Sequence, residues 1–140
     1  MILITGATGF LGHNLVPQLI AAGYKVKTLV RPSSDYRFLQ ELGVELAFTD
    51  DITDGYAALQ AAHGCRYVIH AAGMFRFWGD AHMFWQTNVG GTTAVLNAAL
   101  AEKVEKFIYI STIAVVGRTS SQTRIDENIV CRPQEPYQLS

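Results

Sequence analysis

Three glycines near the amino terminus have the spacing of a phosphate-binding turn. The segment Thr5–Gly12 contains G-x-x-G-x-x-G, which starts at Gly6 directly after a short apolar run at 1–5. In such a turn Gly6 permits the tight bend, Gly9 lets a pyrophosphate approach main-chain N–H groups, and Gly12 allows helix and strand to pack closely. The phosphates would lie at a helix N-terminus, where unpaired N–H donors and the helix dipole favour negative charge. The turn therefore predicts dinucleotide binding; the alternative is a glycine turn with only a structural role.

The residue that follows the next apolar run bears on which dinucleotide is bound. An acidic side chain at this position hydrogen-bonds the ribose 2′-hydroxyl of NAD. Here Val30 is followed by Arg31, and a planar, permanently charged guanidinium suits a 2′-phosphate. We therefore expect NADP as the cofactor, with NAD as the alternative. The other interpretation of Arg31 is a solvated loop arginine.

These residues lie in a chain that alternates between short apolar runs and longer helical stretches. The runs are continuously apolar, which is typical of parallel strands buried on both faces. The order predicts an α/β fold, a doubly wound parallel Rossmann sheet of about five strands with helices on both faces. The predicted strands are 1–5, 25–30, 44–48, 66–71 and 105–111, and the predicted helices are 10–22, 35–42, 54–62 and 82–102.

Residue types also predict local features of these elements. Pro17 predicts a kink in the first helix, and Asp54 is expected to cap the third. Residues 117–140 are predicted to form a loop that turns helical only at 136–137. One face of the first helix is predicted to be buried, namely Leu11, Leu15, Leu19 and Ala22.

Length and composition exclude several classes of protein. The chain has 140 residues, 11 basic and 12 acidic side chains and a formal charge of −1, so we expect one domain and no nucleic-acid partner. No segment reaches the roughly 20 apolar residues that span a bilayer, and the amino terminus lacks the basic region of a signal peptide. Cys65 and Cys131 form no paired motif, and no His or Cys pair has metal-ligand spacing. We expect a cytoplasmic protein with neither a membrane partner nor a metal.

Several segments, taken in order, resemble the extended short-chain dehydrogenase/reductase family, also called the NAD-dependent epimerase/dehydratase family. Thr5–Gly12 is similar to the family's T-G-x-T-G-F-[LIV]-G opening. Asp50 stands where the family usually has glycine, and Val116 where tyrosine is common. The other similar segments are Thr49–Asp54, His70–Gly73, Asn88–Thr92 with Leu96 and Ala98–Ala99, Tyr109–Thr112 with Val115–Gly117, and Asp126–Glu127. The resemblance covers essentially the whole chain and implies an NAD(P)-binding domain over 1–140.

The resemblance implies cofactor contacts at particular positions. Asp51 would reach the adenine amino group, with Ile52 beside the ring. Asn88 would stabilise the site around the fourth strand; the alternative is a helix-interior asparagine bonded to nearby backbone. The complete set is Gly6, Thr8, Gly9, Phe10, Leu11, Gly12, Arg31, Asp51, Ile52, Ala71, Ala72, Gly73 and Asn88.

The resemblance also implies a catalytic pair, Thr112 and Tyr137. Thr112 follows the fifth strand, at the rim where doubly wound sheets bind ligands, and would hydrogen-bond the reacting oxygen; Ser111 is its rival. Tyr137 would exchange a proton with that oxygen. A free tyrosine has a pKa of about 10 and needs assistance near neutrality, which the family's Y-x-x-x-K lysine supplies. The chain ends at Ser140, so we expect that lysine and a substrate domain in a longer enzyme, and cofactor binding without turnover here.

Aromatic residues at 74–78 and 84–85 follow the predicted fourth strand. They could form a wall that selects an apolar or ring-bearing substrate, with Arg76 facing an anionic group, or they could pack against a missing domain. His70 ends a buried strand and is predicted to be a hydrogen-bonded core histidine.

The sequence leaves the reaction open. One hypothesis is epimerisation or dehydration of a nucleotide sugar; another is reduction of a ketone or aldehyde, as in relatives resembling dihydroflavonol reductase. A third is a non-catalytic NADP-sensing module. A homodimer is compatible with each of them.

Overall fold

The computed structural model describes residues 1–76, 78–118 and 125–140. Its sheet has five parallel strands in the order β3-β2-β1-β4-β5. Their bounds are β1 (Ile2–Thr5), β2 (Val26–Val30), β3 (Glu45–Phe48), β4 (Tyr67–His70) and β5 (Lys106–Tyr109). The chain builds outward from β1 to β3 and then crosses over to β4, so the strand order reverses beside β1. The doubly wound fold is confirmed, and its switch point lies at the carboxyl ends of β1 and β4.

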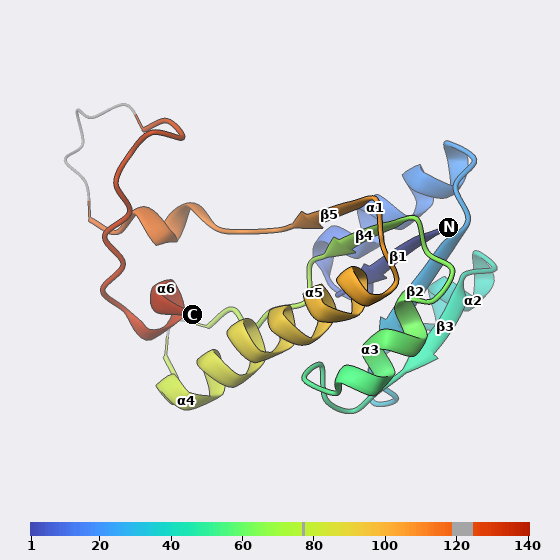
Figure 1. Cartoon of the computed structure of the whole chain (residues 1–140), viewed down its shortest axis with the longest axis horizontal. Helices are drawn as coiled ribbons and strands as arrows, with labels where there is room; N and C mark the ends of the chain where they lie inside the picture. Colours follow the sequence, from blue (N-terminus) through green and yellow to red (C-terminus); the bar gives the residue numbers. More distant parts are fainter. Residues whose placement is uncertain (77, 119–124) are drawn as a thin grey trace.

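Helices cover both faces of this sheet (Figure 1). One face packs against α1 (Phe10–Ala21) and α2 (Arg37–Glu41), and the other against α3 (Gly55–Ala62) and α5 (Gly91–Ala101). Neighbouring strand residues face opposite layers, so that Leu3 and Ile4 in β1 are both completely buried. Such two-sided burial explains the continuously apolar strands. The predicted cap of α3 is confirmed, since Asp54 Oδ1 accepts from the amides of Tyr56 and Ala57 at 3.0 Å each.

The predicted buried face of α1 is wrong at both ends. Gly12 and Val16 are its buried residues, whereas Leu11 is 39% exposed and Ala22 is also exposed. A Cβ atom at Gly12 would lie 2.0 Å from the Ala7 carbonyl oxygen. The helix therefore approaches the β1 turn along Gly12, and this close contact rotates the buried stripe away from Leu11. The helix continues through Pro17, and the predicted kink there stays a prediction.

The predicted helix 82–102 is a single helical path with an irregular middle. It runs through α4 (Ala81–Phe84), a π-helical segment η1 (Trp85–Gly90) and α5. The hydrophobic period did not predict η1. Such π-helical turns are frequently found at functional sites.

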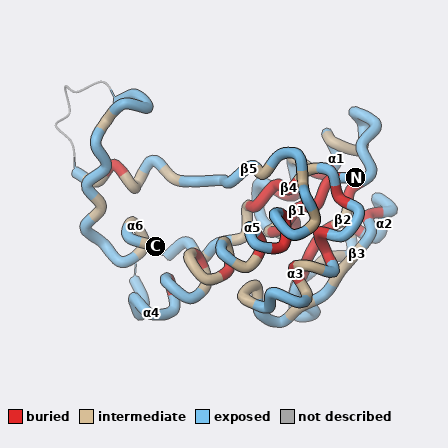
Figure 2. Tube along the Cα trace, in the orientation of Figure 1, coloured by how far each residue is buried: buried red, intermediate tan, exposed pale blue. Residues whose placement is uncertain are grey.

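The chain after β4 and β5 also differs in part from the prediction. β5 ends at Tyr109, two residues earlier than predicted, because its partner β4 ends at His70. A 3₁₀ helix, η2 (Ile113–Val116), follows, and α6 (Pro136–Leu139) covers the predicted helical turn. In Figure 1 the chain leaves the sheet after β5 and returns so that α6 lies near α4. This arm is mostly exposed, whereas the buried residues concentrate in the sheet and its helices (Figure 2).

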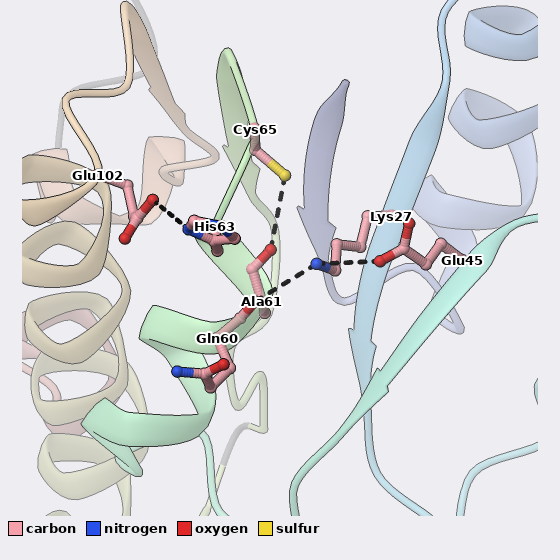
Figure 3. A network of polar contacts seen from close by, with 7 residues as sticks. All are labelled: Lys27, Glu45, Gln60, Ala61, His63, Cys65 and Glu102. Atoms are coloured by element: carbon pink, nitrogen blue, oxygen red, sulfur yellow. Dashed lines mark hydrogen bonds and ion pairs between the residues drawn. The ribbon is translucent and has the colours of Figure 1, made fainter.

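Polar contacts fix α3 at the end of the sheet where the strands begin, here called the amino edge (Figure 3). The opposite end, where the strands finish, is called the carboxyl edge. Lys27 Nζ lies 3.0 Å from Glu45 Oε1 and donates to the Gln60 carbonyl oxygen at 3.3 Å. On the other side, His63 Nδ1 lies 2.9 Å from Glu102 Oε2. These contacts tie α3 to β2, β3 and the end of α5, away from the carboxyl edge.

In the ranges that the structure describes, none of the helices has the length and apolar character needed to cross a bilayer.

Candidate functional site

The glycine turn leaves main-chain donors free at the start of α1. Gly6 has φ +73°, and a Cβ atom there would lie 2.5 Å from the Ala71 carbonyl oxygen, so only glycine fits between β1 and the loop after β4. Gly9 is the N-cap of α1 and provides no capping side chain. The N–H groups of a first helical turn lack intrahelical acceptors. They suit an anion such as a diphosphate.

A cleft of about 500 Å³ opens beside this turn. Its walls come from the carboxyl ends of four strands, β1 to β4, as expected for a ligand site on a doubly wound sheet. The predicted cofactor residues that line it are Gly6, Thr8, Gly9, Arg31, Asp51, Ile52, Ala71, Ala72 and Gly73. Phe10, Leu11, Gly12 and Asn88 do not line it. The Phe10 side chain is 91% exposed, so Phe10 and Leu11 could serve a ligand through their main-chain amides.

Two arginines near the end of β2 differ in their surroundings. Arg37 forms an exposed ion pair with Asp35, whose oxygen Oδ2 lies 2.6 Å from Arg37 Nη2. The hydrogen bonds from Arg37 lower the pKa of Asp35 to about 2. Among the described residues no carboxylate pairs with Arg31, which lines the cleft. Of the two, Arg31 is therefore the guanidinium available to a ligand.

The loop after β3 is fixed by a contact that the sequence interpretation missed. Asp51 Oδ1 accepts from the Thr53 amide at 2.9 Å, which folds the loop. A Cβ atom at Gly91 would lie 2.6 Å from Ile52 Cγ2, so Ile52 packs directly on the backbone of α5. The Gly90-Gly91 pair in the sequence was the available indication of such a close approach.

A second cleft, of about 430 Å³, shares the segment Ala71–Phe75 with the first. It lies between the ends of β4 and β5, η2 and α6. The three predicted catalytic residues, Ser111, Thr112 and Tyr137, all line it, together with Asn88 and Ser140. The structure thus brings residues 25 positions apart in the sequence to one cleft, next to the glycine-turn cleft.

The two predicted catalytic side chains are held by different means. Thr112 Oγ1 accepts from the Ala114 amide at 3.2 Å, which leaves its hydroxyl proton free to be donated. The Tyr137 ring makes edge contacts with Phe75 and Phe84, with centroid distances of 5.0 and 6.2 Å. Part of the aromatic segment therefore packs on Tyr137. Trp78, at 78% exposure, remains open to solvent.

Asn88 connects three parts of this site from its place in η1. Its Oδ1 accepts from the Met74 amide at 2.7 Å, and its Nδ2 donates to the Met74 carbonyl oxygen at 3.2 Å. The same Nδ2 donates to Ser140 Oγ at 2.9 Å. Asn88 thus fixes the loop after β4 and joins it to α6.

Two further sequence predictions concern Arg76 and His70. Arg76 lines the first cleft and not the one that contains Tyr137. His70 is completely buried, and its ring nitrogens lie within hydrogen-bond distance of Thr5 and Thr92. The prediction of a hydrogen-bonded core histidine is therefore confirmed. No three His, Cys, Asp or Glu side chains come together as a metal site within 1–76, 78–118 and 125–140.

Comparison with known proteins decides the family. The model of the NAD dependent epimerase/dehydratase family matches residues 2–140. This chain belongs to that family. The chain is similar to a putative dihydroflavonol 4-reductase from Synechocystis sp., with 36% identity over 126 residues. The matched region covers 89% of this chain and 36% of that relative. Another is a 2-alkyl-3-oxoalkanoate reductase from Shewanella oneidensis, 36% identical over 125 residues, or 89% and 32% of the two chains.

Solved structures of the epimerase/dehydratase family confirm the fold. The UDP-glucose 4-epimerase of Thermus thermophilus in complex with NAD superposes with a TM-score of 0.85 at 26% identity, over 99% of this chain and 46% of the epimerase. A short-chain dehydrogenase/reductase superfamily protein from Agrobacterium tumefaciens with bound NAD gives 0.83 at 29% identity, over 99% and 41%. The chain spans about a third of the length of the two reductases and less than half of these structures.

Proposed function

We propose that this chain is the cofactor-binding part of an NADP-dependent oxidoreductase that transfers hydride between nicotinamide and a carbonyl or hydroxyl substrate. The observation that carries the proposal is the shared segment Ala71–Phe75, which lines both the glycine-turn cleft and the cleft of Thr112 and Tyr137. A dinucleotide on the turn could thereby reach the hydroxyl groups. Turnover is proposed for the longer protein, and cofactor binding for this chain.

The residues present fit such a cofactor. The free amides at the start of α1 suit its diphosphate, and Arg31 suits a 2′-phosphate. Asp51 and Ile52 line the same cleft and would contact the adenine. When bound, the nicotinamide supplies or accepts the hydride. In the second cleft, Thr112 would donate a hydrogen bond to the reacting oxygen, and Tyr137 would exchange a proton with it.

For the substrate, we propose an apolar ketone or aldehyde in preference to a nucleotide sugar. The reductases named above are 36% identical to this chain, whereas the nucleotide-sugar epimerase is 26% identical. Phe75, which contacts Tyr137 and is 63% exposed, also suits an apolar compound more than a sugar.

Titration of the chain with NADPH and NADH tests the cofactor. We expect NADPH to bind more tightly, and Arg31→Ala to weaken NADPH by roughly tenfold or more while leaving NADH unchanged, since a charge-assisted phosphate contact is lost. The matched control is Arg66→Ala at the amino edge, where Arg66 pairs with Glu105. A preference for NADH, together with an Arg31→Ala variant that binds like the parent, would refute the choice of NADP.

Assays of the longer protein test the reaction. We expect NADPH oxidation with apolar ketones or aldehydes, and loss of turnover without loss of NADPH binding in Tyr137→Phe and Thr112→Val. Turnover of nucleotide sugars alone would replace the proposed substrate. Binding of NADPH without turnover on either panel would favour the alternative, a non-catalytic NADP-sensing module.

A further inference from the structure

A buried chain of hydrogen bonds runs beneath α5 to the loop after β4. The ring nitrogens of His70 lie 3.0 Å (Nε2) from Thr92 Oγ1 and 2.6 Å (Nδ1) from Thr5 Oγ1. Thr5 Oγ1 in turn accepts from the Ala72 amide at 3.2 Å. Thr5 and His70 are completely buried. We call Thr92, His70, Thr5 and Ala72 the polar chain.

The geometry determines where the protons lie. The Ala72 amide can only donate, so the Thr5 oxygen accepts from it, and the Thr5 hydroxyl proton needs an acceptor of its own because a buried donor left unpaired is costly. Within the described part of the molecule, the acceptor found for it is His70 Nδ1. Nδ1 therefore carries no proton. The ring proton is on Nε2 and is donated to Thr92.

The polar chain ends at the loop that both clefts share. Ala71 and Ala72 are bound to Thr5 by two hydrogen bonds, from the Ala71 amide to the Thr5 carbonyl oxygen at 3.2 Å and from the Ala72 amide to Thr5 Oγ1. The Thr5 hydroxyl that accepts the second bond also lies 2.6 Å from His70 Nδ1. His70 is therefore placed to orient the group that holds the centre of the loop.

We propose that His70, in its Nε2–H form, is a positioning residue: it orients the Thr5 hydroxyl so that Thr5 holds the Ala72 amide and fixes the loop between the two clefts. Its importance for cofactor binding rests on the proposed function. The protonation and hydrogen bonding of the polar chain do not depend on the proposed function.

Nitrogen NMR of the ¹⁵N-labelled chain tests the proton assignment without any cofactor. We expect the Nδ1 resonance of His70 to be that of an unprotonated ring nitrogen and the Nε2 resonance that of a protonated one at pH 7. The opposite tautomer, or a doubly protonated ring, would overturn the proposal. This measurement requires no variant, so it does not depend on a substitution being tolerated.

Substitutions at Thr5 test the positioning role. In Thr5→Val the Ala72 amide loses its acceptor, so we expect its hydrogen exchange to accelerate by about tenfold relative to the Ile4 amide, and the NADPH dissociation constant to rise by about tenfold. Thr5→Ser retains the hydroxyl and should restore both to within about twofold. The matched control is Thr28→Val on β2, where Thr28 Oγ1 is buried without a hydrogen-bond partner among the described residues; it should change neither quantity.

The outcomes separate the two proposals. Faster exchange at Ala72 with an unchanged NADPH dissociation constant would refute the positioning role. Equal acceleration at Ala72 and Ile4 would show a general loss of stability and would also refute it. If the unsubstituted chain bound no dinucleotide, the proposed function would fail, while the tautomer and the exchange at Ala72 would still decide the state of the polar chain.

Discussion

At the scale of single residues, His70 makes the stability of the chain depend on pH. Burial lowers the pKa of His70 from 6.5 to about 4. Between these values the unfolded chain binds a proton that the folded chain does not, so acid favours unfolding. The contribution of His70 is therefore complete above pH 6.5 and is lost as the pH falls toward 4. We expect the free energy of unfolding to be about 2 kcal/mol lower at pH 5 than at pH 7.5 from this residue, as measured by urea unfolding at both values.

A matched pair of variants isolates this effect. His70→Gln cannot titrate and should flatten the dependence of the unfolding free energy on pH between 5 and 7.5. His82→Gln removes an exposed histidine and should leave that dependence as it is in the parent chain. An unaltered dependence in His70→Gln would contradict the assignment.

Single residues also show what the sequence could predict about the site. Gly6 and Arg31, which both line the first cleft, were identifiable as candidates from local spacing, namely a turn after a strand and a cation at the next strand end. The contact of Tyr137 with Phe75 and Phe84, and the bonds from Asn88 to Met74, depend on tertiary placement. No local pattern specifies which aromatic ring a tyrosine more than 50 positions away will meet.

At the scale of elements, close contact between α1 and the β1 turn leaves no room for a larger residue at Gly12. In Gly12→Ala the new methyl would lie 2.0 Å from the Ala7 carbonyl oxygen. Because that neighbour is backbone, the helix itself would have to move, and we expect a loss of about 2–4 kcal/mol in the free energy of unfolding. Thermal and urea unfolding measure it.

Gly55→Ala provides the matched control, since Gly55 begins α3 and an added Cβ there meets no atom of the described residues within 4 Å. Replacing glycine by alanine in a helix reduces the entropy of the unfolded chain, so this variant should gain about 0.5–1 kcal/mol. Equal effects at the two positions would show that the contact with Ala7 is not the cause.

The same contact explains where the prediction of elements failed. Hydrophobic periodicity located all five strands and the helical path 81–101. In β1, β2 and β4, burial on both faces leaves a continuous apolar pattern. It did not predict the buried face of α1, which depends on the small size of Gly12 and not on the most apolar stripe. Nor did it predict η1, within which Asn88 bonds to Met74 of the loop after β4, a tertiary contact that no hydrophobic period specifies.

At the scale of the whole molecule, the two ends of the sheet have different roles. The contacts of Lys27 and Glu102 fix α3 at the amino edge. The carboxyl edge carries both clefts, with the glycine turn and the loop after β4 between them. Three of the four ion pairs found among the described residues lie at this amino edge, away from both clefts, so Lys27→Met is not expected to affect a ligand site directly.

The strand β5 at one side of the sheet has an exposed apolar surface. β5 is an edge strand, and Ile108 aligns with Ile69, whose layer is covered by α1 and α2. Neither helix extends over β5, so Ile108 and Ile110 are 42% and 43% exposed. An apolar edge strand with unpaired main-chain groups tends to associate with another chain.

We therefore expect the 140-residue chain to self-associate as its concentration rises, and the double variant Ile108→Lys/Ile110→Lys to remain monomeric in sedimentation velocity experiments. Lysines on an exposed edge oppose strand pairing through repulsion and hydration. Lys25→Glu, on an exposed residue just before β2, is the control and should associate like the parent. A parent chain that stays monomeric, or a double variant that associates equally, would show that this edge is not the contact surface.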